Sequence, residues 1–162
     1  MKRLFTDKDA AELVNIAVEL ANTIATDNKG LSPVAICCIT HQPDVMAVPT
    51  ASRRMDGAKS LSAVTALHKA FTVLAYEADS IKHANKIKSG SWSEADMLMR
   101  QNTTPMFCPW DGGIMVMNQK GKLLCALAAA GRSSEGDRRL MVLAAHKMGY
   151  KTNFDKNGEP LE

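Results

Sequence analysis

Two pairs of short apolar segments constrain the fold of this chain more than any other feature. Each pair flanks a short polar turn, which is the pattern of a β-hairpin. The first segment is rich in β-branched side chains and too short for a buried helix. The four predicted strands cover residues 33–40, 45–48, 114–117 and 122–130. The polar segment 52–58 that follows the first pair is predicted to be a loop.

Helical periodicity fills the stretches around these hairpins. A first amphipathic helix is predicted from a cap at Thr6 to a stop at Gly30, with Leu13 and Leu20 on its apolar face. Further helices are predicted at 60–79, 81–88, 94–100 and 134–148. The order α-β-β-α-α-α-β-β-α predicts an α/β (α+β) fold, in which helices pack on an antiparallel sheet.

The length of 162 residues suits one compact domain, which we place at residues 1–150. Residues 151–162 form a polar C-terminal tail that is expected to be loose or to pack on a neighbouring molecule.

Charge and composition exclude several classes of function. The formal net charge of +3 comes from interspersed basic and acidic residues, so no nucleic-acid partner is expected. No apolar stretch reaches the ~20 residues that span a bilayer, and no secretory signal is visible, so we expect no membrane association and a cytoplasmic location. The four cysteines are interpreted as thiols, and no histidine or cysteine spacing predicts a metal site.

Two blocks of motifs resemble a known family. The first combines residues 54–58, Ser62 and residues 69–72, and the second combines residues 112–114, 131–133 and Asp137. Their order and spacing resemble the GlcG/HbpS-like family, which includes the C-terminal domain of PduO-type corrinoid adenosyltransferases. The likeness spans approximately residues 6 to 148.

The resemblance implies a profilin-like fold and assembly into homo-oligomers, often octamers. It also implies a link with haem or corrinoid chemistry. The chain departs from the family pattern at the turn 41–44 and in residues 102–110. Its first predicted helix contains no histidine, so that helix offers no imidazole ligand to a haem iron.

Several residues of these blocks are candidates for binding an anionic ligand. Arg54, Asp56 and Gly57 lie where a loop enters a helix, and helix N-termini favour anions. The alternative is that Arg54 and Asp56 pair with each other. The other candidates are small or hydroxyl-bearing residues that could offer backbone N–H groups or hydroxyls, namely Ser62, Gly112, Gly113, Gly131 and Ser133.

Three further side chains could carry chemistry. Lys69, seven residues after Ser62, is a candidate for a desolvated amine, and the alternative is a lysine paired with an acid. Cys108 is a candidate nucleophile or haem ligand, or else a partly buried thiol. His68 is a candidate axial haem ligand, or else a histidine of the core or of an interface.

Three functions follow as hypotheses. The first is an accessory protein that binds haem, another tetrapyrrole or a small anionic ligand at an intersubunit cleft. The second is an enzyme of small oxo- or hydroxy-acid or diol catabolism that uses Lys69 or Cys108. The third is an oligomeric partner of a corrinoid-dependent enzyme.

Overall fold

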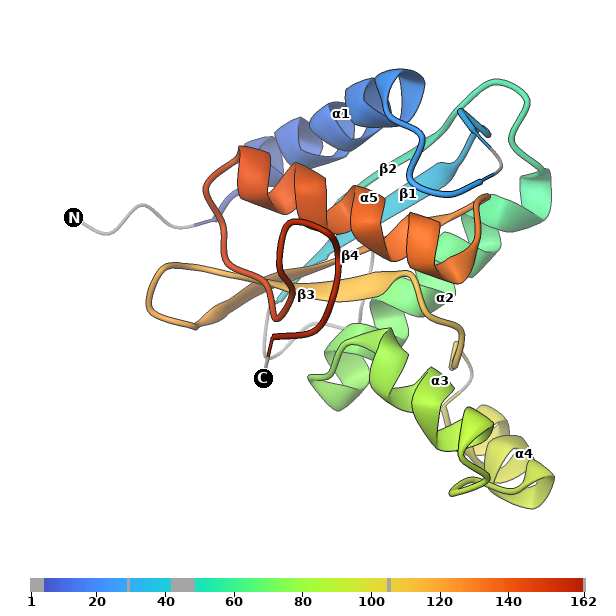
Figure 1. Cartoon of the computed structure of the whole chain (residues 1–162). Helices are drawn as coiled ribbons and strands as arrows, with labels where there is room; N and C mark the ends of the chain where they lie inside the picture. Colours follow the sequence, from blue (N-terminus) through green and yellow to red (C-terminus); the bar gives the residue numbers. More distant parts are fainter. Residues whose placement is uncertain (1–4, 29, 42–48, 105, 162) are drawn as a thin grey trace.

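The computed structural model describes residues 5–28, 30–41, 49–104 and 106–161, and it contains helices and strands in the predicted order (Figure 1). The elements are α1 (Asp7–Thr23), β1 (Ala35–Thr40), β2 (Ala51–Arg54), α2 (Ser60–Tyr76), α3 (Ser80–Lys88), α4 (Glu94–Thr103), β3 (Gly113–Met117), β4 (Leu123–Ala130) and α5 (Ser134–Lys147). The strands form one antiparallel sheet in the order β2-β1-β4-β3, which confirms the predicted fold class. None of the described helices has the length and apolar character needed to cross a membrane.

The two faces of the sheet are covered unequally. Helices α1 and α5 lie together on one face, and α2 lies on the other (Figure 1). Side chains alternate along each strand, so Ile36 and Cys38 of β1 face α1 and α5, whereas Cys37 faces α2. The β4 side chains that face α2 are alanines, and their small size lets α2 approach the sheet closely. Consequently α2 is the sole described helix covering its face.

Strand β2 corrects the predicted loop at 52–58. Residues 51–54 pair with Ala35–Cys38 of β1 as an edge strand, while the strand predicted at 45–48 lies outside the described residues. The side chains of Ser52, Arg53 and Arg54 are exposed. Backbone hydrogen bonds therefore hold β2, and the apolar alternation that identifies a strand in a sequence is missing.

The outer edge of β3 is closed by side chains of the α2–α3 corner. Ser80 Oγ accepts a hydrogen bond from Gly113 N at 2.8 Å and donates one to Gly113 O at 3.0 Å. Asp79 Oδ1 accepts a hydrogen bond from Met115 N at 2.6 Å. Burial raises the pKa of Asp79, and its hydrogen bonds oppose that rise. These contacts satisfy backbone groups that an open strand edge would offer to another chain.

The C-terminal segment packs on the chain's own core, whereas the sequence predicted a tail that is loose or packs on a neighbouring molecule. Phe154 is 2% exposed and belongs to the core beneath α5. Lys151 forms a two-hydrogen-bond bridge with Met117, and Arg138 Nε donates to Gly158 O at 2.8 Å. One buried aromatic side chain thus anchors a segment whose sequence is otherwise polar.

Replacing Gly131 by alanine should lower the free energy of unfolding by more than about 3 kcal/mol. Gly131 has φ +149°, and a Cβ there would lie 2.4 Å from Pro33 O and 2.9 Å from Val34 Cα, both backbone atoms. Gly121→Ala is the matched control, because its φ of +79° imposes strain while no atom lies within 4 Å. Urea unfolding should show a loss of about 1 kcal/mol for the control. Equal losses in the two variants would contradict the close approach at Gly131.

Candidate functional site

The residues of the two sequence motifs converge at one end of the sheet. Ala35 of β1 pairs with Arg54 on one side and with Ala130 on the other, so the turns after β2 and β4 lie side by side. Gly57 and Gly131 both lie against Pro33. Arg54, Gly57 and Gly131, three of the candidate anion contacts, therefore lie at the same end of the sheet.

Lys69 lies at the centre of this end and is 3% exposed. Its Nζ donates to Ala129 O at 2.9 Å and to Asp137 Oδ2 at 3.2 Å. Asp137 also accepts hydrogen bonds from the backbone N–H of Arg132 at 3.1 Å and from that of Gly131. Burial raises the pKa of Asp137, whereas the Lys69 ammonium opposes the rise. The lysine joins α2, β4 and α5 as part of an ion pair that is closed to solvent.

A second buried ion pair adjoins the first. Arg138 Nη1 donates to Asp111 Oδ2, and Asp111 Oδ1 accepts from Gly112 N at 2.6 Å. Burial raises the pKa of Asp111, and both Arg138 and Lys69 act in the opposite direction. A Cβ at Gly112 would lie 2.7 Å from Lys69 Nζ and 2.9 Å from Asp137 Cβ. Gly112 therefore makes room for the ion pairs.

The N-terminus of α5 is occupied by the chain's own groups. Ser133 Oγ accepts from Gly136 N at 3.0 Å, and Ser133 N donates to Asp27 Oδ2 at 2.6 Å. A Cβ at Gly136 would lie 2.8 Å from the same carboxylate oxygen of Asp27. Arg132 turns away and donates to the carbonyls of Ala21 and Ile24 at the end of α1. An anion approaching Ser133 would have to displace Asp27.

The N-terminus of α2 is open by comparison. Its N-cap residue, Lys59, makes no side-chain capping hydrogen bond, and no acid occupies the first turn. Arg54 is exposed and donates through Nη1 to Ala58 O at 2.6 Å, whereas Asp56 is exposed and forms no ion pair with Arg54. Ser62 is partly buried within the first turn of the helix. These groups remain accessible to an anionic ligand.

Cys108 is a buried thiol. It is 7% exposed, its backbone N–H donates to Thr72 Oγ1 at 2.8 Å, and burial raises its pKa. A thiol with a raised pKa carries little thiolate at neutral pH, and thiolate is the form that attacks or ligates. Gly113 also lies under α2, since a Cβ there would be 3.0 Å from Val73 Cγ2.

His68 belongs to an apolar stripe on the outward side of α2. Leu61, Val64, His68 and Phe71 follow one another at helical spacing on one side of the helix. Leu61 is 71% and Val64 47% exposed, while His68 and Phe71 are partly buried. No hydrogen bond among the described residues uses the His68 imidazole. We call these four residues the α2 stripe.

Four aromatic rings gather at the C-terminal end of α2, and the sequence analysis missed them. We call Tyr76, His83, Trp92 and Phe107 the aromatic cluster. His83 stacks on Trp92 with ring centroids 5.3 Å apart and meets Tyr76 and Phe107 edge-on at 4.9 and 5.9 Å. These rings come from four segments with no shared periodicity. The only sequence signal is the presence of tryptophan and histidine within otherwise polar stretches.

This protein therefore has a mixed α/β fold. One antiparallel sheet carries helices on both faces and is closed at one end by buried ion pairs and glycines. The family model described as "Haem degrading protein HbpS-like" matches residues 5–146. The chain therefore belongs to the HbpS-like family, as its two motif blocks predicted.

Solved structures share the fold. A PduOC:haem complex is 21% identical with a TM-score of 0.74, covering 93% of this chain and 99% of that one. A double mutant of HbpS from Streptomyces reticuli is 21% identical with a TM-score of 0.69, covering 92% and 90%. The ORFY protein of Klebsiella pneumoniae is 17% identical with a TM-score of 0.71, covering 92% and 94%. No curated protein matches the sequence.

Replacing Lys69 by methionine should lower the free energy of unfolding by about 3–5 kcal/mol, because the buried carboxylate of Asp137 loses its counter-ion. The double variant Lys69→Met/Asp137→Asn should recover part of this loss, since it removes the uncompensated charge. Chemical denaturation of the two variants measures the difference. A double variant no more stable than the single one would contradict the assignment of the pair as structural.

The stability of the protein should depend on His83 in mildly acidic solution. Burial and the positive charges of Lys86, Arg100 and Lys82 lower the pKa of His83 to about 4, from 6.5. Between these pH values the unfolded chain binds a proton that the folded chain excludes, so stability falls as the pH falls. Relative to His83→Phe, wild-type protein should lose about 3 kcal/mol across this window. A difference that stays constant from pH 7 to pH 4 would contradict a buried, neutral imidazole.

Proposed function

We propose that this chain is a haem-binding accessory protein, and that the macrocycle lies against the α2 stripe in a cleft between two copies of the chain. The observation that carries the proposal is the stripe itself. Leu61 and Val64 are 71% and 47% exposed on the helix that alone covers its face of the sheet in the described structure. Apolar side chains of this size gain about 1.5–3 kcal/mol each when they are fully buried, which favours a covering partner.

The residues of the stripe suit a haem. A porphyrin needs an apolar surface and an axial ligand, and neutral imidazole is a common ligand of haem iron. His68 lies within the stripe, and its ring nitrogens have no hydrogen-bond partner among the described residues. Iron held there would supply redox chemistry, while the protein fixes the orientation of the macrocycle.

The carboxylates of haem require cationic or N–H groups, and the open N-terminus of α2 offers them. Arg54 and Lys59 are exposed beside the uncapped first turn. A helix N-terminus and a guanidinium both stabilise a carboxylate. Ser62 adds a hydroxyl, and Gly57 lets the preceding loop turn with φ +84°. Asp56 would restrict this end to ligands that tolerate a nearby negative charge.

A second copy of the chain would complete the cleft. Burial of the α2 stripe against its symmetry mate would remove Leu61 and Val64 from water on both copies, as in isologous interfaces generally. The octamer implied by the family resemblance would repeat this contact. The HbpS and PduOC structures support the proposal through their shared fold, and the latter is a haem complex.

The enzymatic hypothesis has less support. The amine of Lys69 is engaged by Asp137 and Ala129 O, and burial raises the pKa of the Cys108 thiol. A substrate in solution could reach neither group in the described structure, because Lys69 is 3% exposed and Cys108 is 7% exposed. Partnership with a corrinoid-dependent enzyme rests on the fold that the chain shares with PduOC.

Titration of the purified protein with ferric haem should give a saturable shift of the Soret band, and His68→Ala should abolish it. The shift reports ligation of iron by the imidazole. His41→Ala and Cys108→Ala are the controls, because one removes an imidazole outside the stripe and the other a buried thiol. Both controls should retain the wild-type spectrum.

Val64→Glu tests the intersubunit cleft separately. It places a charge in the stripe without touching an iron ligand, so it should lower both the mass in sedimentation and the affinity for haem. Binding that survives dissociation would contradict the cleft, and a wild-type Soret band in His68→Ala would contradict the axial ligand. Absence of any saturable shift in wild-type protein would contradict haem binding itself.

A further inference from the structure

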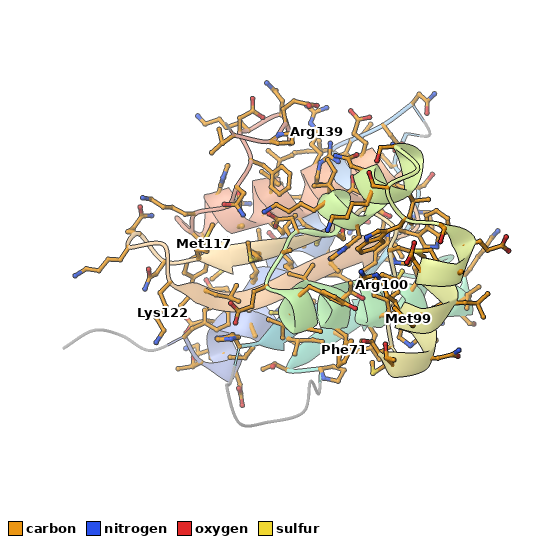
Figure 2. The ribbon with its side chains drawn as sticks, turned by 90° about the horizontal axis from the view of Figure 1, so that it is seen from below. Phe71, Met99, Arg100, Met117, Lys122 and Arg139 are labelled. Carbon is orange, nitrogen blue, oxygen red and sulfur yellow. The ribbon has the colours of Figure 1, made fainter. Side chains whose placement is uncertain are left out.

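The guanidinium of Arg100, which belongs to α4, lies against the aromatic cluster. Arg100 of α4, labelled in Figure 2, places its guanidinium carbon 3.9 Å from the ring centroid of Trp92 and 5.9 Å from that of Tyr76. Lys86 of α3 lies 4.8 Å above Trp92. His83 and Arg100 therefore meet around the same two rings, Tyr76 and Trp92.

Polar atoms of this cluster lack partners. Both ring nitrogens of His83 and the Nε atom of Arg100 are buried without a hydrogen bond among the described residues. His83 is 3% exposed. Each buried polar group left in this state costs about 1–3 kcal/mol, so three in one cluster are an unusual burden for a fold to carry without a compensating partner.

The partner that these atoms fit can be defined chemically. The charged groups that act on His83 are Lys86, Arg100 and Lys82, all positive, which disfavours a cationic ligand. In either tautomer the neutral imidazole offers one N–H donor, and Arg100 Nε–H offers another. Two N–H donors in one cluster of rings match a carboxylate, and the rings around them match a flat, unsaturated body. A doubly charged anion would suffer a larger desolvation cost among these rings.

Access to the cluster depends on α4. This helix, Glu94–Thr103, has no buried residue. It is held at its start by the capping box of Ser93 and Asp96 and at its end by the stacking of Arg100 on Trp92. An element with so few buried contacts opens at low cost, so local opening of α4 is the route by which a small ligand would reach the cluster.

We propose that the aromatic cluster is a second binding site, which takes a small planar carboxylate. The ring of the ligand packs against Trp92 and Phe107, and its carboxylate accepts hydrogen bonds from Arg100 Nε–H and from the N–H of His83. The site is separate from the α2 stripe and does not require haem.

Benzoate is the probe for this site, and Trp92 fluorescence is the readout. The chain has two tryptophans, so a Trp110→Phe background leaves Trp92 as the sole reporter. Benzoate should change the emission saturably at millimolar concentrations. Cyclohexanecarboxylate, which keeps the charge without the flat ring, and benzamide, which keeps the ring without the charge, should bind at least about tenfold more weakly.

Two substitutions in that background decide the assignment. Arg100→Gln lies on a helix without buried residues and should keep the fold while weakening benzoate at least about tenfold. His83→Gln should weaken it as well, with circular dichroism confirming that the fold is intact. A response absent from the parent, unchanged by Arg100→Gln, or equal for the three probes would overturn the proposal. The haem spectrum of the same variants should stay unchanged, so failure here is distinguishable from failure of haem binding.

Discussion

The ion pair between Lys69 and Asp137 is the contact on which the arrangement of this protein depends. It joins α2, from one face of the sheet, to α5, from the other, and Ala129 O of β4 shares the ammonium. Two charges can be buried together only when their remaining hydrogen-bonding groups are satisfied. The backbone N–H groups of Gly131 and Arg132 donate hydrogen bonds to the Asp137 carboxylate. The absence of a side chain at Gly112 leaves space for both partners of the ion pair. Gly112 is thus a consequence of this buried contact, whereas Gly131 is required by the close approach of the Pro33 and Val34 backbone.

That contact also determines where ligands can bind. Side chains and N–H groups that satisfy one another are withdrawn from solvent, so the closed end of the sheet has no free anion-binding group to offer at Lys69, Gly112 or Ser133. The two helix N-termini near this end show the contrast: Asp27 and Ser133 occupy the start of α5, while the first turn of α2 has no capping side chain. Both sites that we propose therefore lie along α2, one on its outward stripe and N-terminal end and the other at its C-terminal end.

The sequence predicted those parts of the fold that depend on periodicity, which include the order of the elements, the antiparallel sheet and the family. Strand β2 was missed because backbone pairing with β1 stabilises it, and backbone groups are the same in every residue. The docking of the C-terminal segment was missed because one residue, Phe154, supplies the anchor. For Lys69 the sequence left a paired and a reactive amine open, because its partner Asp137 lies 68 residues away and a lysine in an apolar helix has the same sequence pattern in both cases. The aromatic cluster requires four segments to meet, which no local pattern encodes.

The unequal layering of the fold explains why α2 carries both proposed sites. Helices α1 and α5 cover each other's flanks as well as their face of the sheet, whereas α2 covers its face alone and leaves an apolar side outward. His68 and Tyr76 are separated by eight residues, or about 12 Å along the helix axis. The α2 stripe and the aromatic cluster therefore share a helix but no side chain. Because the two sites share no side chain, we expect a haem and a small carboxylate to bind this protein without competing.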